Sequence, residues 1–300
     1  MHFLNTIVVG AIPLVPRRII RFFAGRYIAG ESLEDAIRCV RQLNSEGACA
    51  TMDVLGEDIT TRAEALAARD QSIAVLHTIA QEHLDSNLSI KLTSLGLKID
   101  KQFCTENVRE ILKVAAGYKN FVRVDMEDSG CTTDTLDAFR TVHREYTNVG
   151  IVVQAYLLRT EADVRALLRE GTGFRLCKGI YKEPAGIAFQ QRGEVQGNYM
   201  KLLEQMFAAN SYVGIATHDS VLVDGALALI ARLGLRKDQY EFQMLLGVRP
   251  ELRKRLVRDG HKVRLYVPYG EHWYGYSTRR FKENPAIAGY VFKALFTRNA

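Results

Sequence analysis

The sequence predicts a (β/α)8 barrel of the TIM type, and three features of the chain support this fold class. Eight short apolar segments recur along the 300 residues, and amphipathic helical patterns lie between them. The segments start roughly 25 to 40 residues apart, which is the length of one strand plus one crossover helix. Eight such units over about 250 residues match the size of this barrel. We therefore expect one domain over residues 1–300.

The expected strands are apolar or alternating runs of about four to eight residues, bounded by polar or turn-forming residues. In chain order they cover residues 48–54, 88–93, 121–126, 150–155, 174–178, 212–217, 240–244 and 262–267. An extra N-terminal helix precedes the first strand, because Ser32 and Asp35 form a capping signal before an amphipathic run that ends at Leu43.

The helices between the strands begin at residues that favour a first helical turn. These starts are Thr60 or Thr61, Thr132 with Thr133, Thr160, Asp219 and Pro250. The first, fourth and fifth of these helices extend to His83, Leu233 and Asp259. A C-terminal helix after the eighth strand is expected to pack at the barrel mouth.

A doubly wound sheet is the second candidate fold, but the phosphate-binding fingerprint of that fold is missing. The nearest match, Gly171-Thr172-Gly173, lacks the third glycine and precedes a strand instead of following one. The sequence contains neither a Walker A motif nor an HExxH helix. No linker or change of composition divides the chain, so we retain the single barrel domain.

Composition indicates a globular chain with a modest basic excess. Of its residues 47% are apolar, and 40 Lys and Arg against 34 Asp and Glu give a formal charge of +6. The basic residues are scattered among acids, which argues against nucleic acid as a partner. The five cysteines lie far apart and form no CxxC pair, so neither a disulfide framework nor a zinc ribbon is expected.

The N-terminal apolar run, residues 7–15, resembles neither a signal peptide nor a membrane span. Pro13 interrupts the run, its positive charges follow it, and it is too short to cross a bilayer. We therefore expect a cytoplasmic protein whose contact with the inner face of the membrane is at most peripheral.

Polar side chains stand at or just beyond the ends of the expected strands, where the active sites of such barrels lie. They are Asp53, Glu57, Lys91, Asp125, Gln154, Lys178, Thr217, His218, Gln243 and Tyr266. Four of them, at positions 91, 125, 154 and 178, interrupt otherwise apolar strands. Because a lone buried charge is costly, we expect charges of both signs at this mouth to form a paired functional set.

The segment after the last strand carries a second group of charges. Arg279 and Arg280 are adjacent, so on a helix their side chains point about 100° apart and reach different groups. Glu283 follows Arg280 by three residues and shares its helix face. A solvated basic surface helix is the alternative interpretation of this pair.

These residues belong to motifs that resemble those of the proline dehydrogenase family, flavoenzymes that oxidise L-proline to 1-pyrroline-5-carboxylate. The motifs are Asp53-x-x-x-Glu57, Ser89-x-Lys91, Val124-Asp125-Met126, Gln154-x-Tyr156, Arg175-x-x-Lys178-x-x-Tyr181, Ala216-Thr217-His218, Glu241-x-Gln243-x-Leu245-x-Gly247, Tyr266-x-Pro268-x-Gly270, Tyr276-x-x-Arg279-Arg280 and Glu283-Asn284. They keep the family's order from about Phe22 to Pro285. The chain resembles the monofunctional bacterial form, because no aldehyde dehydrogenase region follows.

The resemblance implies a binding site for L-proline. Its substrate-binding residues would be Lys91, Tyr181, Leu245, Tyr266, Tyr276, Arg279 and Arg280. The three cations would hold the carboxylate, and the tyrosines with Leu245 would enclose the apolar ring. Asp125 and Arg175 are the implied catalytic residues, and Glu57 would form a supporting ion pair with Arg279.

FAD is the cofactor that the resemblance implies, and no metal is expected. The FAD-binding residues would be Met126, Gln154, Arg175, Lys178, Gly179, Ile180, Thr217, His218, Arg280 and Glu283. A guanidinium near the flavin is chemically reasonable, because a cation stabilises the negative charge that arrives with a hydride.

Further partners follow from the resemblance. The family passes electrons to a membrane quinone, and the product of a monofunctional form goes to a separate pyrroline-carboxylate dehydrogenase. The apolar and arginine-rich residues 7–23 are a candidate for peripheral contact with anionic lipid.

Two other functions are compatible with the residues. A barrel aldolase or isomerase would use Lys91 or Lys178 as a Schiff-base amine, and such a site usually includes a glycine-rich phosphate pocket. Only Gly247 and Gly270 lie where such a pocket is expected, and two separate glycines are weak support for it. A non-catalytic basic protein that binds nucleic acid or lipid is the third hypothesis, and the scattered charges argue against it.

Overall fold

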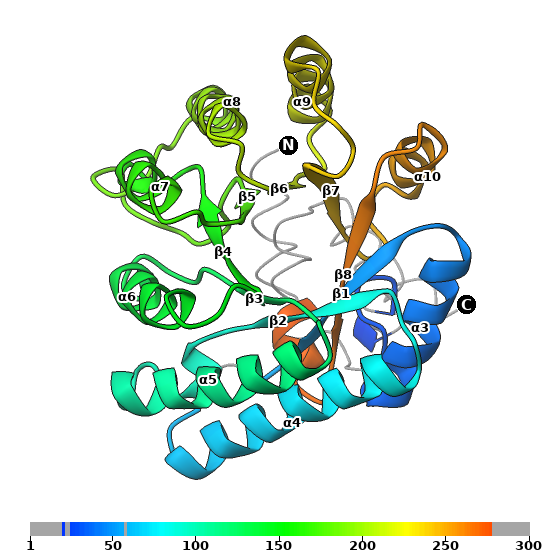
Figure 1. Cartoon of the computed structure of the whole chain (residues 1–300), viewed down its shortest axis with the longest axis vertical. Coiled ribbons are helices and arrows are strands. Elements are labelled where there is room, and N and C mark those ends of the chain that lie inside the picture. Colours follow the sequence, from blue (N-terminus) through cyan, green and yellow to red (C-terminus); the bar gives the residue numbers. More distant parts are fainter. Residues whose placement is uncertain (1–19, 22–24, 57–58, 278–300) are drawn as a thin grey trace, which may run out of the picture.

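The computed structural model describes residues 20–21, 25–56 and 59–277, in which eight parallel strands close into a barrel (Figure 1). The strands are β1 (Cys49–Val54), β2 (Ser86–Ile90), β3 (Val122–Val124), β4 (Val149–Gln154), β5 (Phe174–Cys177), β6 (Val213–Ala216), β7 (Tyr240–Leu245) and β8 (Val263–Tyr269). Each strand pairs with the next in chain order, and β8 pairs with β1. The fold class predicted from the sequence is confirmed.

Helices alternate with the strands and surround the barrel (Figure 1). They are α3 (Leu33–Ser45), which precedes β1, and then α4 (Arg62–Gln81), α5 (Lys101–Gly117), α6 (Thr132–His143), α7 (Thr160–Leu168), α8 (Arg192–Ala208), α9 (Ser220–Leu233) and α10 (Pro250–Arg258). The expected caps at Ser32, Thr61 and Asp219 are confirmed, because each side chain accepts a hydrogen bond from a backbone N–H of the first turn.

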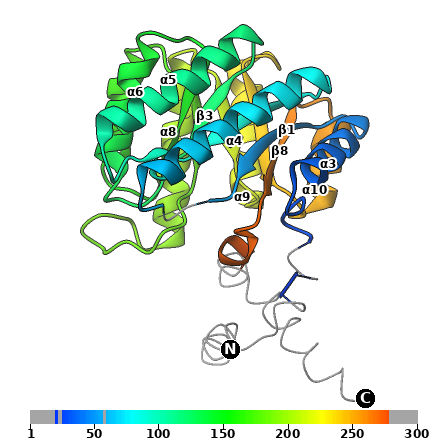
Figure 2. The same ribbon diagram turned by 90° about the horizontal axis from the view of Figure 1, so that it is seen from below.

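The extra N-terminal helix takes a place in the ring of helices. It packs against both β1 and β8, so α3 covers the joint at which the barrel closes. Residues 273–277, which follow β8, form a helical turn beyond the carboxyl end of that strand (Figure 2). The rest of the expected C-terminal helix lies outside the described residues.

The second strand is shorter than the sequence suggests. It ends at Ile90, and a 3-10 turn, η2 (Thr93–Leu95), follows it. Leu92, Leu95 and Leu97 are buried in and around this turn. The apolar run that predicted a strand to residue 93 therefore reflects burial of a turn, which apolarity alone does not distinguish from a strand.

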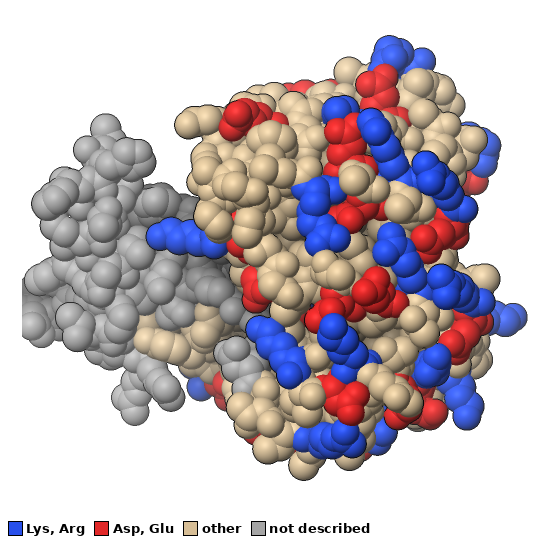
Figure 3. Space-filling view, turned by 90° about the vertical axis from the view of Figure 1, so that its left-hand side faces the viewer, with Lys and Arg blue, Asp and Glu red and all other residues tan. Residues whose placement is uncertain are grey.

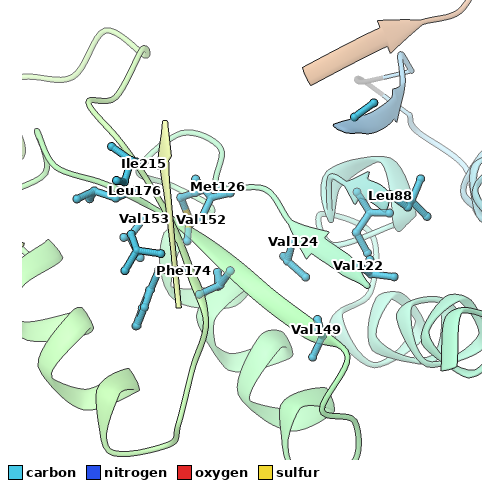
Figure 4. Packing of buried hydrophobic residues seen from close by; sticks show 14 of the residues in the cluster. Leu88, Val122, Val124, Met126, Val149, Val152, Val153, Phe174, Leu176 and Ile215 are labelled. Atoms are coloured by element: carbon cyan, nitrogen blue, oxygen red, sulfur yellow. The ribbon is translucent and has the colours of Figure 1, made fainter. Parts of the chain in front are cut away.

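Alternation along the strands gives the sheet an apolar outer face and a polar inner face. Val122, Val124, Val149 and Phe174 are at most 2% exposed and belong to the apolar core (Figure 4). Arg123, which lies between two of these valines, is also buried. The interior of the barrel is thus where buried charges have to find partners.

Two further findings concern only the part of the chain that the structure describes. None of the helices there is both long and apolar enough to cross a bilayer. Nor do His, Cys, Asp and Glu side chains gather there in the arrangement of a metal site.

Gly150 provides a test of how tightly the barrel interior is packed. A Cβ at this position would lie 2.4 Å from Nη1 of Arg123 and 2.6 Å from the carbonyl oxygen of Gly173. Because that carbonyl belongs to the backbone directly before β5 and cannot move aside easily, we expect Gly150→Ala to lower the free energy of unfolding by about 1–3 kcal/mol. Denaturant unfolding of the purified protein measures this loss.

Gly197→Ala on α8 is the matched control. No heavy atom lies within 4 Å of the Cβ that this change would add. Alanine also favours the helical state over glycine, so stability should stay the same or rise. Equal losses in the two variants would show that interior packing is not the cause.

Candidate active site

Asp125 lies at the centre of a group of side chains inside the barrel. Its Oδ1 is 2.6 Å from Nη1 of Arg175 and accepts a hydrogen bond of 2.7 Å from the Ser89 hydroxyl. Its Oδ2 accepts a hydrogen bond of 2.9 Å from the Tyr266 hydroxyl. The donors come from β2, β5 and β8, so three strands orient one buried carboxylate.

A second ion pair joins this group through Tyr266. Nζ of Lys91 is 2.6 Å from Oδ1 of Asp53, with only 10% and 2% of the two side chains exposed. The same Nζ donates to the Tyr266 hydroxyl at 3.2 Å. Burial raises the pKa of Tyr266 well above its usual value, so this hydroxyl keeps its proton. It therefore bridges Lys91 and Asp125.

Arg175 has a second partner besides Asp125, and it contacts a different nitrogen of the guanidinium. Its Nε donates to Oε1 of Gln243, whose Nε2 donates to Oε1 of Glu241 at 2.6 Å. Nε of Arg264 donates to the same Glu241 oxygen at 2.8 Å. Burial alone would raise the pKa of Glu241, but Arg264 and Lys262 outweigh it and lower the pKa to about 2. Glu241 is therefore ionised at neutral pH.

The ends of β5 and β6 carry a second, more open cluster. Oδ2 of Asp219 is 3.3 Å from Nζ of Lys178 and 3.1 Å from Nη2 of Arg192, and it accepts a hydrogen bond from Gln196. The two cationic side chains are 41% and 74% exposed. They can therefore meet an anionic group from solution without losing their carboxylate partner.

The remaining polar strand-end residues are fixed by backbone groups. Nε2 of His218 accepts a hydrogen bond of 2.8 Å from the Leu245 N–H, so this nitrogen carries no proton. The Thr217 hydroxyl accepts from the Asp219 N–H, and Gln154 donates to the carbonyl oxygen of residue 127 at 2.8 Å. These contacts hold the loops after β3 and β6 in place.

Gly179, the second residue after β5, adopts a backbone conformation that residues with a side chain rarely take. Its φ is +110°, and a Cβ there would lie 2.0 Å from the Tyr156 ring. Ile180 is 42% exposed, Tyr181 is half-buried and Met126 is buried. Glycine is therefore required for the path that carries Ile180 and Tyr181 past the Tyr156 ring, whereas Met126 lies after β3.

Several expected site residues belong to the C-terminal segment. Tyr276 is buried in the helical turn after β8. Glu57, Arg279, Arg280 and Glu283 lie outside the described residues.

Several side chains of this network were not predicted as site residues from the sequence. Ser89, Glu241 and Arg264 were given no role, and Asp53 and Gln243 were named only as strand-end and motif residues. The signal for them was present, because polar and apolar residues alternate along β7 and β8. In strands whose outer face is covered by helices, the polar residues of such a pattern line the interior.

Comparison with known proteins identifies the family. The sequence model described as "Proline dehydrogenase" matches residues 36–292. The chain belongs to the proline dehydrogenase family. Proline dehydrogenase 2 of Bacillus subtilis (strain 168) is 40% identical over 275 residues, which are 92% of this chain and 91% of that relative. The proline dehydrogenase of Deinococcus radiodurans is 36% identical over 277 residues, or 91% of this chain and 89% of that relative.

Solved structures show the same fold within longer proteins. Proline utilization A (PutA) from Bdellovibrio bacteriovorus, inactivated by N-propargylglycine, superposes with a TM-score of 0.83 at 24% identity. The match covers 88% of this proline dehydrogenase and 33% of that chain, so this protein spans about a third of its length.

Proline dehydrogenases are FAD-dependent, and the residues at this barrel mouth fit a flavin. Nη2 of Arg175 is buried and has no hydrogen-bond partner among the described residues. A flavin oxygen or nitrogen can accept that hydrogen bond, which removes the cost of an unsatisfied donor. Lys178 and Arg192 suit the phosphates, because both are cations on the open side of the site.

The Lys91 and Asp53 pair gives a pH-dependent test of the network. Burial raises the pKa of Asp53 to about 6, and Lys91 opposes that rise. A carboxyl whose pKa is higher in the folded state loses its contribution to stability as the pH rises through the folded pKa. In Lys91→Met this pKa rises further, so stability should keep falling above pH 6, by up to about 1.4 kcal/mol per pH unit. Unfolding at pH 5 and pH 8 measures the effect.

The double variant Lys91→Met with Asp53→Asn is the control, because it has no carboxyl to titrate at this position. Its stability deficit relative to the wild type should be the same at pH 6.5 and pH 8. A single-variant deficit that does not grow between pH 5 and pH 8 would mean that Asp53 is not linked to Lys91.

Proposed function

We propose that this proline dehydrogenase binds L-proline at the carboxyl ends of β2, β3 and β8 and FAD over β4 to β6. The network around Asp125 carries the proposal. It brings Arg175 and Tyr266 to one carboxylate at 2.6 and 2.9 Å, and Lys91 joins the network by donating to the Tyr266 hydroxyl at 3.2 Å. The enzyme oxidises proline, and these are the charged and polar groups that a bound amino acid would meet.

The substrate carboxylate pairs with Lys91, together with Arg279 and Arg280. Cations suit a small carboxylate, and a guanidinium can hold it with two parallel hydrogen bonds. Glu57 balances Arg279. The substrate ring lies among apolar and aromatic side chains that select it by shape, namely Tyr181, Leu245, Tyr266 and Tyr276.

The flavin site uses the second cluster and the loops beside it. FAD contacts Met126, Gln154, Arg175, Lys178, Gly179, Ile180, Thr217, His218, Arg280 and Glu283. Bound FAD would supply the acceptor for the hydride that leaves C5 of proline. Arg175 donates from Nη2 and offsets the negative charge that develops there. Asp125 keeps Arg175 in place and balances its charge, since both carboxylate oxygens already accept hydrogen bonds.

The further partners belong to the same proposal. Electrons pass on to a quinone, and the product passes to a separate pyrroline-carboxylate dehydrogenase. The protein is a single cytoplasmic domain over residues 1–300 that contacts the membrane peripherally. Leu158, Ile187 and Val221, which lie in or next to loops after β4 to β6, are 46%, 38% and 60% exposed and support such a contact.

Two observations argue against the alternative functions. Lys91 lies 2.6 Å from a carboxylate, which favours the charged ammonium over the neutral amine that a Schiff base needs. Basic and acidic side chains are interspersed on the face drawn in Figure 3. Exposed ion pairs of the protein, such as Arg109 with Glu145, also join charges of opposite sign. A surface of this kind lacks the basic stripe that nucleic acid requires.

Tyr266→Phe tests the proposed substrate site. L-proline should bleach the flavin absorbance of the purified enzyme under anaerobic conditions. Hydrogen bonds to charged groups contribute about 1.5–3 kcal/mol, so loss of this hydroxyl should lower kcat/KM for proline by roughly 10- to 100-fold. Stopped-flow bleaching over a range of proline concentrations measures the change.

Tyr118→Phe is the matched control, because its hydroxyl meets only His77 at the surface among the hydrogen bonds of the described residues. It should bleach at the wild-type rate. If Tyr266→Phe leaves kcat/KM unchanged, the Tyr266 hydroxyl is not part of the substrate site. If L-proline does not bleach the wild-type flavin, the proposed reaction is refuted.

A further inference from the structure

A chain of hydrogen bonds crosses the barrel interior from β8 to the end of β3. It runs from Arg264 to Glu241, Gln243, Arg175 and Asp125, and every member is at most 8% exposed. Two of its members, Glu241 and Arg264, lie deeper than the proposed substrate and flavin contacts. Glu241 and Arg264 therefore do not bind the substrate or the flavin directly, and any effect they have on the reaction is indirect.

Glu241 is held as a carboxylate that can only accept hydrogen bonds. Arg264 donates to its Oε1 at 2.8 Å, and Nζ of Lys262 is 3.5 Å from its Oε2. Both neighbours are cations, which favour the ionised form. The group next to Glu241 on the active-site side must therefore present a donor to it.

That group is the Gln243 amide, which has one donor end and one acceptor end. Because Nε2 faces Glu241 at 2.6 Å, Oε1 must face Nε of Arg175. A turned amide would place a donor against the Arg175 N–H and an acceptor against the Glu241 carboxylate. The charge on Glu241 therefore fixes which end of the amide Arg175 meets.

The backbone of β6 confines the same amide. A Cβ at Gly214 would lie 2.4 Å from Nε2 and 2.7 Å from Cδ of Gln243. The amide thus packs directly against a glycine that leaves no spare room. The charge on Glu241 fixes which way the Gln243 amide points, and the contact with Gly214 fixes its position.

We propose that Glu241, acting through Gln243, is a positioning residue for Arg175, and that it holds the guanidinium in the orientation that FAD requires. The inference rests on the proposed contact between Arg175 and FAD. Neither Glu241 nor Gln243 touches the substrate in this account. Their effect reaches the reaction only through the direction of one N–H group.

Glu241→Gln is the first test, because an amide at position 241 lets the Gln243 amide turn. A small displacement of a reacting group costs on the order of 100-fold, so we expect the rate of flavin reduction to fall by at least about tenfold with KM for proline little changed. The midpoint potential of bound FAD should fall as well, since a displaced guanidinium stabilises the reduced flavin less. A mere loss of nearby negative charge would raise that potential instead and overturn the inference.

The double variant Glu241→Gln with Gln243→Glu is the second test. The carboxylate at position 243 then accepts from Arg175 and from the amide at position 241, while the total charge is unchanged. We expect this variant to recover most of the rate lost in Glu241→Gln. A double variant that folds and binds FAD but is no faster than the single variant overturns the inference.

Gly214→Ala keeps the proposal testable if Glu241→Gln does not fold. It displaces the Gln243 amide while leaving Glu241 and Arg264 unchanged, so it should lower the rate and the FAD potential in the same direction. A folded Gly214→Ala enzyme with wild-type values contradicts the inference. Glu145→Gln, which removes a surface carboxylate paired with Arg109, is the matched control and should leave both values unchanged.

Arg175→Lys separates the inference from the proposed function. If this variant alters the potential and rate while Glu241→Gln and Gly214→Ala alter neither, only the positioning role fails. If Arg175→Lys itself leaves both values unchanged, the proposed contact between Arg175 and FAD fails, and the inference fails with it.

Discussion

The ion pair between Arg175 and Asp125, 2.6 Å long, lies where the inner faces of β2, β3, β5, β7 and β8 meet. Neither charge is stable in a closed barrel without partners, because the desolvation cost of a buried ion exceeds what one contact returns. The surrounding side chains supply those partners, namely Ser89, Tyr266 and Gln243. The polar interior of this proline dehydrogenase is therefore a consequence of holding one guanidinium and one carboxylate at its mouth.

The backbone has adapted to these long side chains with glycine at specific points. Gly150 makes room for Arg123, and Gly214 makes room for Gln243. Arg123 uses that room to donate to two backbone carbonyls, those of Ile151 and Gly173. In both places, absence of a side chain on one strand allows a long polar side chain of another strand to lie flat inside the barrel.

Most of the fold was predictable because strand and cap signals are local. Ser32, Thr61 and Asp219 cap helices as expected, whereas the helix starts at Asp100 and Gln191 were not identified. Gly193 and Gly197 weaken the helical pattern after Gln191. The strand-end residues were also predictable as a group, since parallel strands end at one mouth. Their individual partners depend on which inward-facing side chains of different strands lie at the same height in the barrel. A single sequence does not contain this information.

A crystal structure of the enzyme with FAD bound tests the central claim most directly, because that claim concerns a site organised before the cofactor arrives. We expect Arg175 to keep its contacts with Asp125 and Gln243, and its Nη2, which has no partner among the described residues, to donate to the isoalloxazine ring. A flavin bound away from Arg175, or a guanidinium that has left Asp125 to reach it, would contradict the account.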